Sequence, residues 1–175
     1  MATDYSKLPN ISAQGTWTVS STKHGFGIEN LHDGNVETFW QSDGHQPHSI
    51  SVQFPKRHQI HAVSLYLDID KDESYTPCRV AICAGTNQYD KQLVKDEVFT
   101  NEPRGWVDFR LTDIDGPMLM AHFLHIEIPL NYENGKDVRV RMVRVLGPPP
   151  SEEKFRREHI LPYTSQEFYM YESLR

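Results

Sequence analysis

The sequence predicts an all-β protein that folds as an antiparallel β-sandwich. Apolar and polar residues alternate with a period of two in about seven or eight short runs, which is the pattern of half-buried strands. Turn-forming residues separate these runs, and no apolar period of helical length interrupts them, so βαβ units and a parallel sheet are not expected. With 175 residues, the chain is long enough to form one such domain with a substantial core.

The expected elements follow a polar N-terminal stretch, residues 1–15, which we predict to be an extended arm. Weak alternation over 17–21 predicts a first strand, and 27–33 fit one helical turn closed by Gly34. The remaining strands are expected at 50–54, 63–69, 80–84, 93–99, 106–111, 124–130 and 138–146. In the last run the apolar phase changes between Met142 and Val143, and this one-residue slip predicts a β-bulge.

Consecutive prolines at 148–150 end the predicted domain, because proline cannot continue a β-ladder. We therefore divide the chain into an arm (1–15), a sandwich domain (16–147) and a C-terminal tail (148–175). Within the tail, 152–160 fit a short helix, and 164–167 have the form of a capping box. Phe168, Tyr171 and Leu174 recur every third residue, so a helical turn would place them on one face.

Composition excludes several classes of function. The formal net charge of −6 argues against non-specific nucleic-acid binding as the main task. No apolar run approaches the ~20 residues of a membrane span, and the N-terminus lacks the apolar segment of a secretion signal. Cys78 and Cys83 are five positions apart, which places them on opposite faces of a strand, where they cannot form a disulfide with each other. A reducing compartment, the nucleus or the cytoplasm, is expected.

The segment 30–48 surrounds one large aromatic residue, Trp40, with turn formers on both sides. One interpretation is that Trp40 closes the end of the hydrophobic core while its indole N–H bonds to a loop carbonyl, and local chemistry favours this one. The other interpretation is a surface loop that presents side chains to a partner. That second interpretation assigns a loop platform to Thr38, Trp40, Gln41, Ser42 and Asp43.

The sequence contains no clear catalytic or metal-binding motif. Histidines are paired at 45/48, 58/61 and 122/125, but i and i+3 diverge on a strand, and the first pair has no third ligand nearby. There is no nucleophile elbow or phosphate-binding glycine loop. The adjacent carboxylates Asp72 and Glu73 diverge on an extended chain, whereas a glycosidase needs convergent acids. We therefore expect no metal, cofactor or catalytic residue, while a sandwich hydrolase remains open until an acid pair can be excluded.

Recognition residues tend to lie on loops of a rigid β-scaffold. Three loops carry unusual residues: 38–48, 72–77 (DESYTP) and 131–137 (NYENGKD). Asn134-Gly135 is a strong turn signal and would display Lys136 and Asp137 at a tip.

Five motifs in order give the chain a family resemblance. They are Gly25-Phe26-Gly27, residues 37–44 (ETFWQSDG), Gln46-Pro47-His48, residues 72–77 and Asn134-Gly135-Lys136-Asp137. Together they resemble the DOC domain of ubiquitin ligases, from about Trp17 to Leu146. Chain length and the end of the tail are most similar to the free-standing DOC subunits of the anaphase-promoting complex. The resemblance implies a jelly-roll sandwich similar to galactose-binding domains and no catalysis.

The resemblance also implies partners and site residues. Such a subunit acts with a propeller-shaped coactivator as co-receptor for the destruction box of cell-cycle substrates. The implied degron and coactivator surface is Asp72, Glu73, Ser74, Tyr75, Asn134, Gly135, Lys136 and Asp137. The implied docking residues of the tail are Tyr171, Leu174 and Arg175, which would bind a tetratricopeptide-repeat subunit of a complex built on a cullin-like scaffold. No nucleic acid or membrane is implied.

Two departures from the family pattern concern these sites. Lys136 stands where the family commonly has arginine, and lysine lacks the bidentate fork of a guanidinium. Leu174 replaces the usual isoleucine, a volume-conserving change that a groove should tolerate.

The rival hypothesis is a carbohydrate-binding module, because sandwiches of this kind often bind sugars. The aromatic residues that could stack on a sugar ring are Trp40, Tyr75 and Trp106.

Overall fold

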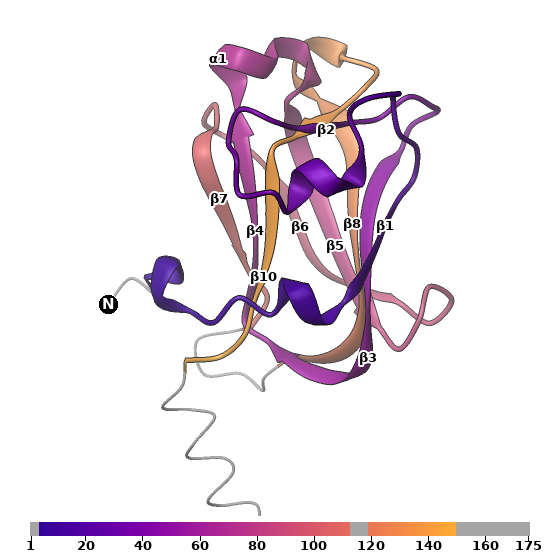
Figure 1. Ribbon diagram of the computed structural model, residues 1–175, viewed down its shortest axis with the longest axis vertical. Coiled ribbons are helices and arrows are strands. Elements are labelled where there is room, and N and C mark those ends of the chain that lie inside the picture. Colours follow the sequence, from indigo (N-terminus) through magenta and orange to yellow (C-terminus); the bar gives the residue numbers. More distant parts are fainter. Residues whose placement is uncertain (1–3, 113–118, 150–175) are drawn as a thin grey trace, which may run out of the picture.

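The computed structural model describes residues 4–112 and 119–149 and shows a β-sandwich whose paired strands are all antiparallel (Figure 1). The larger sheet has the order β1 (Thr16–Val19), β3 (His48–Ile60), β8 (Leu119–Asn131), β5 (Pro77–Gly85), β6 (Gln92–Val98). The smaller sheet has the order β10 (Met142–Leu146), β4 (Ala62–Asp68), β7 (Arg104–Arg110). The jelly-roll, galactose-binding-like sandwich predicted from the sequence is confirmed.

A short third ladder, β2 (Trp40–Gln41) with β9 (Arg139–Val140), lies at one end of the sandwich. Together with the helical turns α1 (Ile69–Asp72), η4 (Glu73–Tyr75) and η5 (Tyr132–Asn134), it forms what we call the loop end, at the top of Figure 1. Two residues are too few for a periodic pattern, and this explains why these strands were not predicted separately. The helical turns elsewhere are η1 (Tyr5–Lys7), η2 (Ser12–Gln14) and η3 (Ile28–Leu31).

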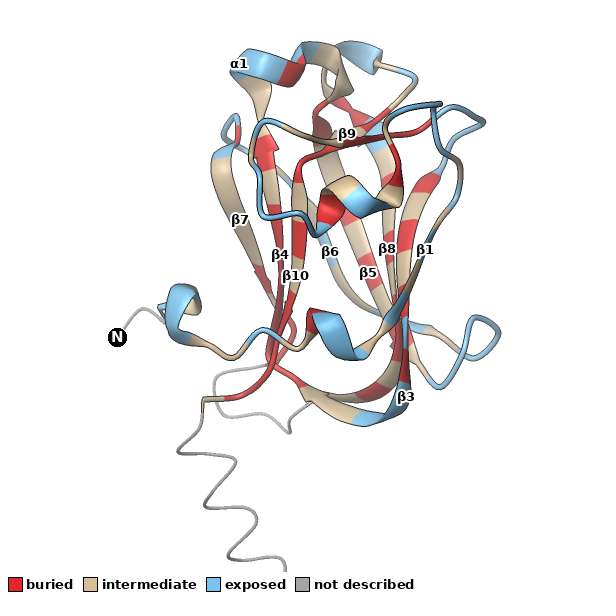
Figure 2. Ribbon diagram, in the orientation of Figure 1, coloured by how far each residue is buried: buried red, intermediate tan, exposed pale blue. Residues whose placement is uncertain are grey.

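Alternation explains where the core lies. Along β4, Val63, Leu65 and Leu67 are fully buried between the sheets, while Tyr66 and Asp68 are turned to the opposite face and are half-buried. Figure 2 shows the same separation, with buried residues along the strands and exposed ones in the connecting loops. Each large apolar side chain removed from water in this way contributes about 1.5–3 kcal/mol before entropy is counted.

The phase change predicted in the last apolar run is present, but it separates two strands instead of forming the predicted β-bulge within one. Val140 ends β9, Met142 begins β10, and Arg141 between them bonds through its backbone N–H to Tyr66 O at 3.1 Å. Val138 and Val140 are buried on one side of this break, and Val143 and Val145 on the other. The break therefore turns one apolar run into two strands of different sheets.

The N-terminal arm is less extended than predicted. It contains η1 and η2, because the side chain of Asp4 accepts from Ser6 N and that of Asn10 accepts from Ser12 N. The arm then lies along β10: Ile11 N donates to Val145 O at 2.9 Å, and Ser12 Oγ accepts from Val145 N at 2.8 Å. These bonds place η2 against the smaller sheet.

Candidate functional site

Two segments of the loop end, η4 and η5, pack directly against each other. Tyr132 N donates to Thr76 O at 3.0 Å, and a Cβ built on Gly135 would lie 1.8 Å from Ser74 O. The φ of Gly135 is an ordinary −56°, so glycine is required here for space rather than for conformation. Glu73 at the start of η4 has a φ of 49°, outside the range that most side chains prefer. The two segments therefore form one surface.

Three side chains hold the turn at 135–137 in place through its backbone carbonyls. Gln46 and Asn131 donate side-chain N–H groups to these carbonyls, and His48 Nε2 contacts Lys136 O, all at distances of 2.6–3.2 Å. His48 is fully buried, and its carbonyl partner requires the proton on Nε2. With its carbonyls used internally, the turn offers mainly side chains to a partner.

The structure brings most of the predicted degron residues together on this surface. Their exposure differs, however: Glu73, Asn134 and Lys136 are exposed, whereas Ser74, Tyr75, Gly135 and Asp137 are half-buried. Asp137 Oδ1 lies 3.3 Å from Ser42 Oγ, so part of its role is internal. The ammonium of Lys136 forms no ion pair with any described residue and is available as a cation at the tip of the turn.

The family resemblance places Asp72 on the degron surface, but the structure buries its side chain. Its carboxylate is buried and accepts two hydrogen bonds of 2.8 Å from Arg141, whose third contact is a 2.7 Å bond to Val36 O. Arg139 Nη1 is 3.7 Å from the same carboxylate. Asp72 is thus occupied in a buried ion pair with the last strands and cannot contact a degron.

Arg139 extends this cluster into an aromatic stack. Its guanidinium lies 4.5 Å from the ring centre of Phe39 and 4.1 Å from that of Tyr75, and its Nε donates to Gln41 Oε1 at 3.0 Å. Phe26 stacks on the other side of Phe39 at 4.8 Å. The stack fixes one face of Tyr75 and leaves a sugar no access to that face.

The loop platform is also corrected in part. Trp40 is fully buried and donates its indole N–H to Ser21 O at 3.0 Å, as the packing interpretation predicts. Gln41 and Ser42 are buried as well, Ser42 Oγ accepting from Val138 N at 2.9 Å. None of the three is presented to a partner. In the predicted platform, Thr38 is half-buried and only Asp43 is exposed.

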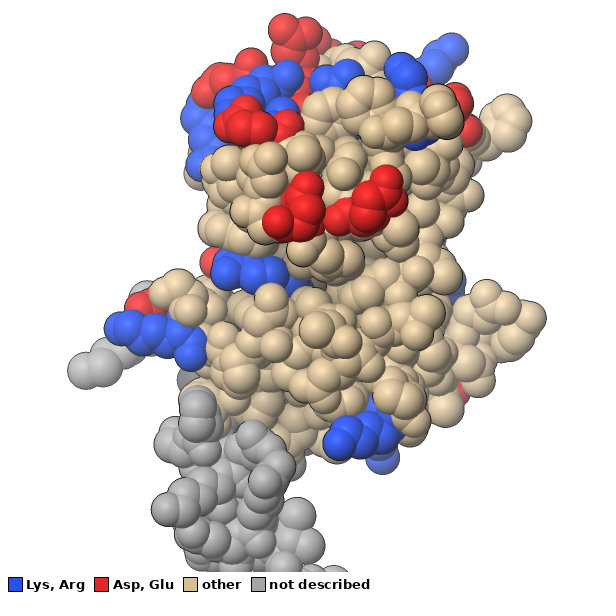
Figure 3. Space-filling view, viewed as in Figure 1, with Lys and Arg blue, Asp and Glu red and all other residues tan. Residues whose placement is uncertain are grey.

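Exposed ion pairs surround the loop end. Lys71 Nζ is 2.6 Å from Glu37, and Arg104 Nε is 2.7 Å from Asp70. These hydrogen bonds lower the pKa of both carboxyl groups. Figure 3 shows acidic and basic side chains interspersed at this end. Pairs so exposed contribute little to stability, and they order the edge of the surface without giving it one sign of charge.

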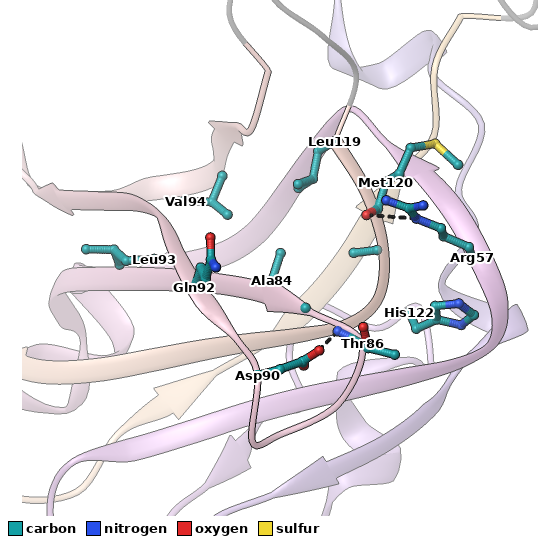
Figure 4. Close-up of a pocket in the computed structure, with 12 residues that line it drawn as sticks. Arg57, Ala84, Thr86, Asp90, Gln92, Leu93, Val94, Leu119, Met120 and His122 are labelled. Atoms are coloured by element: carbon teal, nitrogen blue, oxygen red, sulfur yellow. Dashed lines mark hydrogen bonds between the residues drawn. The ribbon is translucent and has the colours of Figure 1, made fainter.

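The opposite end of the sandwich contains a cavity of about 470 Å³ between β3, β5, β6 and β8 (Figure 4). Two of its polar side chains are already paired: Asp90 accepts from Thr86 N at 2.9 Å, and Arg57 Nε donates to Met120 O at 3.4 Å. It therefore offers a ligand fewer polar groups than the loop end does.

Within 4–112 and 119–149, no cluster of three or more histidine, cysteine or acidic residues could hold a metal ion. Among the same residues, no helix is long and apolar enough to cross a membrane. Tyr171, Leu174 and Arg175, the predicted docking residues, lie outside the described residues.

Residue-by-residue reasoning did not identify the supports Gln46, His48 and Asn131, or the partner of Asp72. Gln46 and His48 stand in a motif that contributed to the family resemblance, but no local signal links them to a turn about 90 positions away. Only the fold brings these segments together.

Sequence comparison places the chain among known proteins. A family model described as "Anaphase-promoting complex, subunit 10 (APC10)" matches residues 3–173. Subunit 10 of Dictyostelium discoideum is 40% identical over 166 residues, covering 94% of this chain and 86% of the relative. The human subunit is 35% identical over 167 residues, covering 94% and 87%.

Structural comparison identifies the same kind of sandwich in sugar-binding modules. The family 32 module of Clostridium perfringens NanJ, solved with galactose, has a TM-score of 0.64 at 15% identity and covers 79% of this chain and 97% of its own. A module of AlyQ, solved with 4,5-unsaturated mannuronic acid, has a TM-score of 0.62 at 16% identity, covering 81% and 98%. At these identities the likeness shows the fold alone. The sequence matches over nearly the whole chain establish that it belongs to the anaphase-promoting complex subunit 10 family.

Proposed function

We propose that the chain is a non-catalytic substrate-recognition and processivity subunit of the anaphase-promoting complex, an E3 ubiquitin ligase. In this proposal it forms a co-receptor for the destruction box with the propeller coactivator, and it promotes ubiquitination of cell-cycle regulators in the nucleus and cytoplasm. The observation that carries the proposal is the surface formed by η4 and η5, where Glu73, Asn134 and Lys136 are exposed and side chains of the fold hold the backbone of 135–137.

The chemistry of this surface suits an extended peptide. Glu73 offers a carboxylate to a degron arginine, and Asn134 and Lys136 offer donors to peptide carbonyls. Half-buried Tyr75, held by Arg139, gives an apolar edge for a leucine. Each contact is weak, and splitting the degron between two proteins makes such contacts cooperate through effective concentration.

A non-catalytic role is consistent with the carboxylates of this surface, because Asp72 is neutralised in its ion pair while Glu73 is exposed. A serine–histidine–glutamate set does occur across β3 and β8, with Ser51 Oγ 2.8 Å from His125 Nδ1 and Glu127 3.7 Å from Nε2. It lies along the strands rather than at the loop end, and it lines neither the cavity of Figure 4 nor the groove described below.

The test is single-encounter ubiquitination of a destruction-box substrate by complexes reconstituted with the variant subunit. Lys136→Ala and Asn134→Ala should shorten the ubiquitin chains added per encounter, while the unfolding midpoint stays unchanged. Lys56→Ala, which removes an equally exposed cation from β3, is the matched control and should behave as wild type. If both loop variants gave ubiquitin chains of unchanged length, the assignment of this surface as the degron-binding site would be refuted.

The tail is part of the same proposal. Tyr171, Leu174 and Arg175 would anchor the subunit to a tetratricopeptide-repeat partner, with the terminal carboxylate captured in a groove, while the cullin-like scaffold belongs to the same complex. Deleting Leu174 and Arg175 should reduce co-purification with the ligase and leave the affinity of the isolated subunit for a degron peptide unaltered. Equal co-purification of the two chains would remove the tail from the proposal.

The only support for the carbohydrate-binding alternative is the shared fold. Trp40 is buried, and guanidinium groups cover a face of Tyr75 and a face of Trp106. A galactose titration followed by NMR is expected to show no saturable shifts at the loop end.

A further inference from the structure

A groove of about 540 Å³ lies on the smaller sheet, between the N-terminal arm and η3. Its floor is β10, and in Figure 1 η2 and η3 lie on either side of it in front of that strand. Figure 3 shows this face hollowed at mid-height, with a basic patch at one side of the hollow and acidic side chains above it. Its lining includes Trp17, Leu31, Trp106, Met142 and Arg144.

Arg144 is half-buried, and its Nε is a buried donor without a polar partner among the described residues. Its guanidinium carbon lies 3.5 Å from the ring centre of Trp106, and its Nε is buried with no hydrogen-bond acceptor among residues 4–112 and 119–149. Burial lowers the pKa of Arg144, and attraction to Asp108 opposes this. Asp108 nevertheless forms no ion pair with it, because the aspartate accepts from Ser64 Oγ on the neighbouring strand.

An unsatisfied donor of this kind is expensive. A buried N–H group without an acceptor costs about 1–3 kcal/mol, and more when the group is charged. Native structures therefore pair such groups with protein, water or a ligand. The cation in the groove thus favours an anion.

The tryptophans add a second requirement. Trp17 donates its indole N–H to Ser12 O at 2.9 Å, whereas Trp106 has no acceptor for its own within the described part of the chain. Leu31 and Met142 complete apolar walls. The groove therefore combines an apolar slot with two donors, the Trp106 N–H and the Arg144 guanidinium, at one side.

We propose that this groove is a docking site for a short segment of a partner protein in which a bulky apolar side chain stands next to a carboxylate. The apolar side chain would enter between Trp17 and Met142, and the carboxylate would accept from Arg144 and Trp106. The volume suits one or two side chains. Exposed Asp33, between two residues that line the groove, would repel a run of acids, so the proposal requires one carboxylate and not an acidic tract. This site is independent of the loop end and of the function proposed above.

The chain provides its own reporters, because it has three tryptophans, of which Trp17 and Trp106 line the groove and Trp40 is buried at the loop end. We would label tryptophan with nitrogen-15 and follow the indole N–H signals of the full chain. The probe is acetyl-Phe-Glu-amide, and its controls are acetyl-Phe-Gln-amide and acetyl-Ala-Glu-amide. The chemical shifts of the Trp17 and Trp106 indole signals should change saturably as the probe is added, and that of Trp40 should not change.

Binding of either control peptide should be weaker by a factor of about ten, which corresponds to the loss of one charge-assisted hydrogen bond or one buried side chain. Arg144→Gln should weaken the probe by a similar factor, and Arg57→Gln, the same change at an exposed arginine of β3, should not. Trp106→Phe keeps a ring in place but removes the N–H. It should weaken binding of the probe by less than Arg144→Gln does, and this loss is read from the Trp17 signal.

Three outcomes would overturn the proposal. The first is no shift at Trp17 and Trp106, and the second is equal binding of the glutamate and glutamine probes. The third is that removal of residues 150–175 by itself shifts both signals and opens the groove to the probe, because the occupant would then be the tail of this chain and not a partner.

Discussion

Arg141 and Arg144 are three positions apart near the end of the fold, yet their surroundings are opposite. The side chain of Arg141 is 4% exposed and is held by both oxygens of Asp72 and by a backbone carbonyl at the loop end. Arg144 stacks on Trp106 and has no polar partner among the described residues. The break at Arg141 directs one arginine to the loop end and the other to the outer face of the smaller sheet. The difference is that the fold supplies acceptors to the buried Arg141, whereas it leaves the half-buried Arg144 only an aromatic ring.

The largest expected effect is on the satisfied side of this comparison. Asp72→Asn should destabilise the domain by about 3–5 kcal/mol, because it leaves the Arg141 charge buried and unpaired. Arg144→Gln should change the free energy of unfolding by about 1 kcal/mol or less, because it loses the stacking on Trp106 but also removes a donor that has no acceptor. Urea unfolding of both variants measures the difference. Equal losses would mean that the two arginines are energetically alike.

A double variant is the control for this prediction. Asp72→Leu with Arg141→Met replaces the pair by apolar side chains, and it should recover most of the loss, because a buried ion pair is often no more stable than apolar residues of similar volume. A double variant as unstable as Asp72→Asn alone would show that the geometry of the pair, and not its charge balance, holds the loop end.

The tryptophans extend the comparison to aromatic residues. Trp40→Phe should cost about 2–3 kcal/mol, from a cavity and from the Ser21 carbonyl left without its donor. Trp106→Phe should cost about 0.5 kcal/mol or less, because its N–H has no acceptor to lose and the side chain is only half-buried. Thermal unfolding would rank them, and a reversed order would contradict both assignments.

Gly135 tests how tightly the loop end is packed. Gly135→Ala should cost about 1–2 kcal/mol, because the new methyl group must displace the Ser74 carbonyl. Amide NMR shifts should be confined to η4, η5 and their neighbours. Gly147→Ala is a suitable control, since its Cβ would meet nothing closer than 3.4 Å. If both substitutions were neutral, η4 and η5 would not be locked together.

The smallest expected effect is a pH dependence that neither arginine controls. Burial, the main cause, and Lys91 lower the pKa of His125 below its usual 6.5, while Glu127 opposes the shift. The unfolded chain then binds more protons than the folded one in the interval between the two pKa values, so stability falls as the pH is lowered through 6.5 toward the folded value. His125→Gln should flatten this slope, and Arg144→Gln should leave it unchanged. A slope that is unaffected by His125→Gln would assign the effect to other histidines.

The sequence predicted what depends on local alternation. The strands around Ile50, Leu65, Ile82 and Ile126 occur where the period-2 pattern placed them, and the slip before Val143 separates two strands. Short motifs in a fixed order were sufficient to identify the family. These features are encoded within a few neighbouring residues, or within one ordered set of turns.

Contacts between distant segments could not be predicted from the sequence. Asp72 stands among exposed charged residues, and nothing nearby indicates that Arg141, 69 positions later, neutralises it. The groove likewise combines Trp17, Trp106 and Arg144 from three strands of the fold. Trp40 is an intermediate case. Its sequence surroundings allowed two interpretations, and its burial in the structure selects the packing interpretation.

The support of residues 135–137 from beneath also has an evolutionary consequence. Because Gln46, His48 and Asn131 hold the carbonyls of 135–137, the exposed side chain at 136 has no duty in folding, whereas positive φ angles restrict the residues that fit at 133 and 134. Position 136 can therefore change at almost no cost in foldability. Under the proposed function, exchanging lysine and arginine at 136 would change the contact with a degron and leave the fold intact.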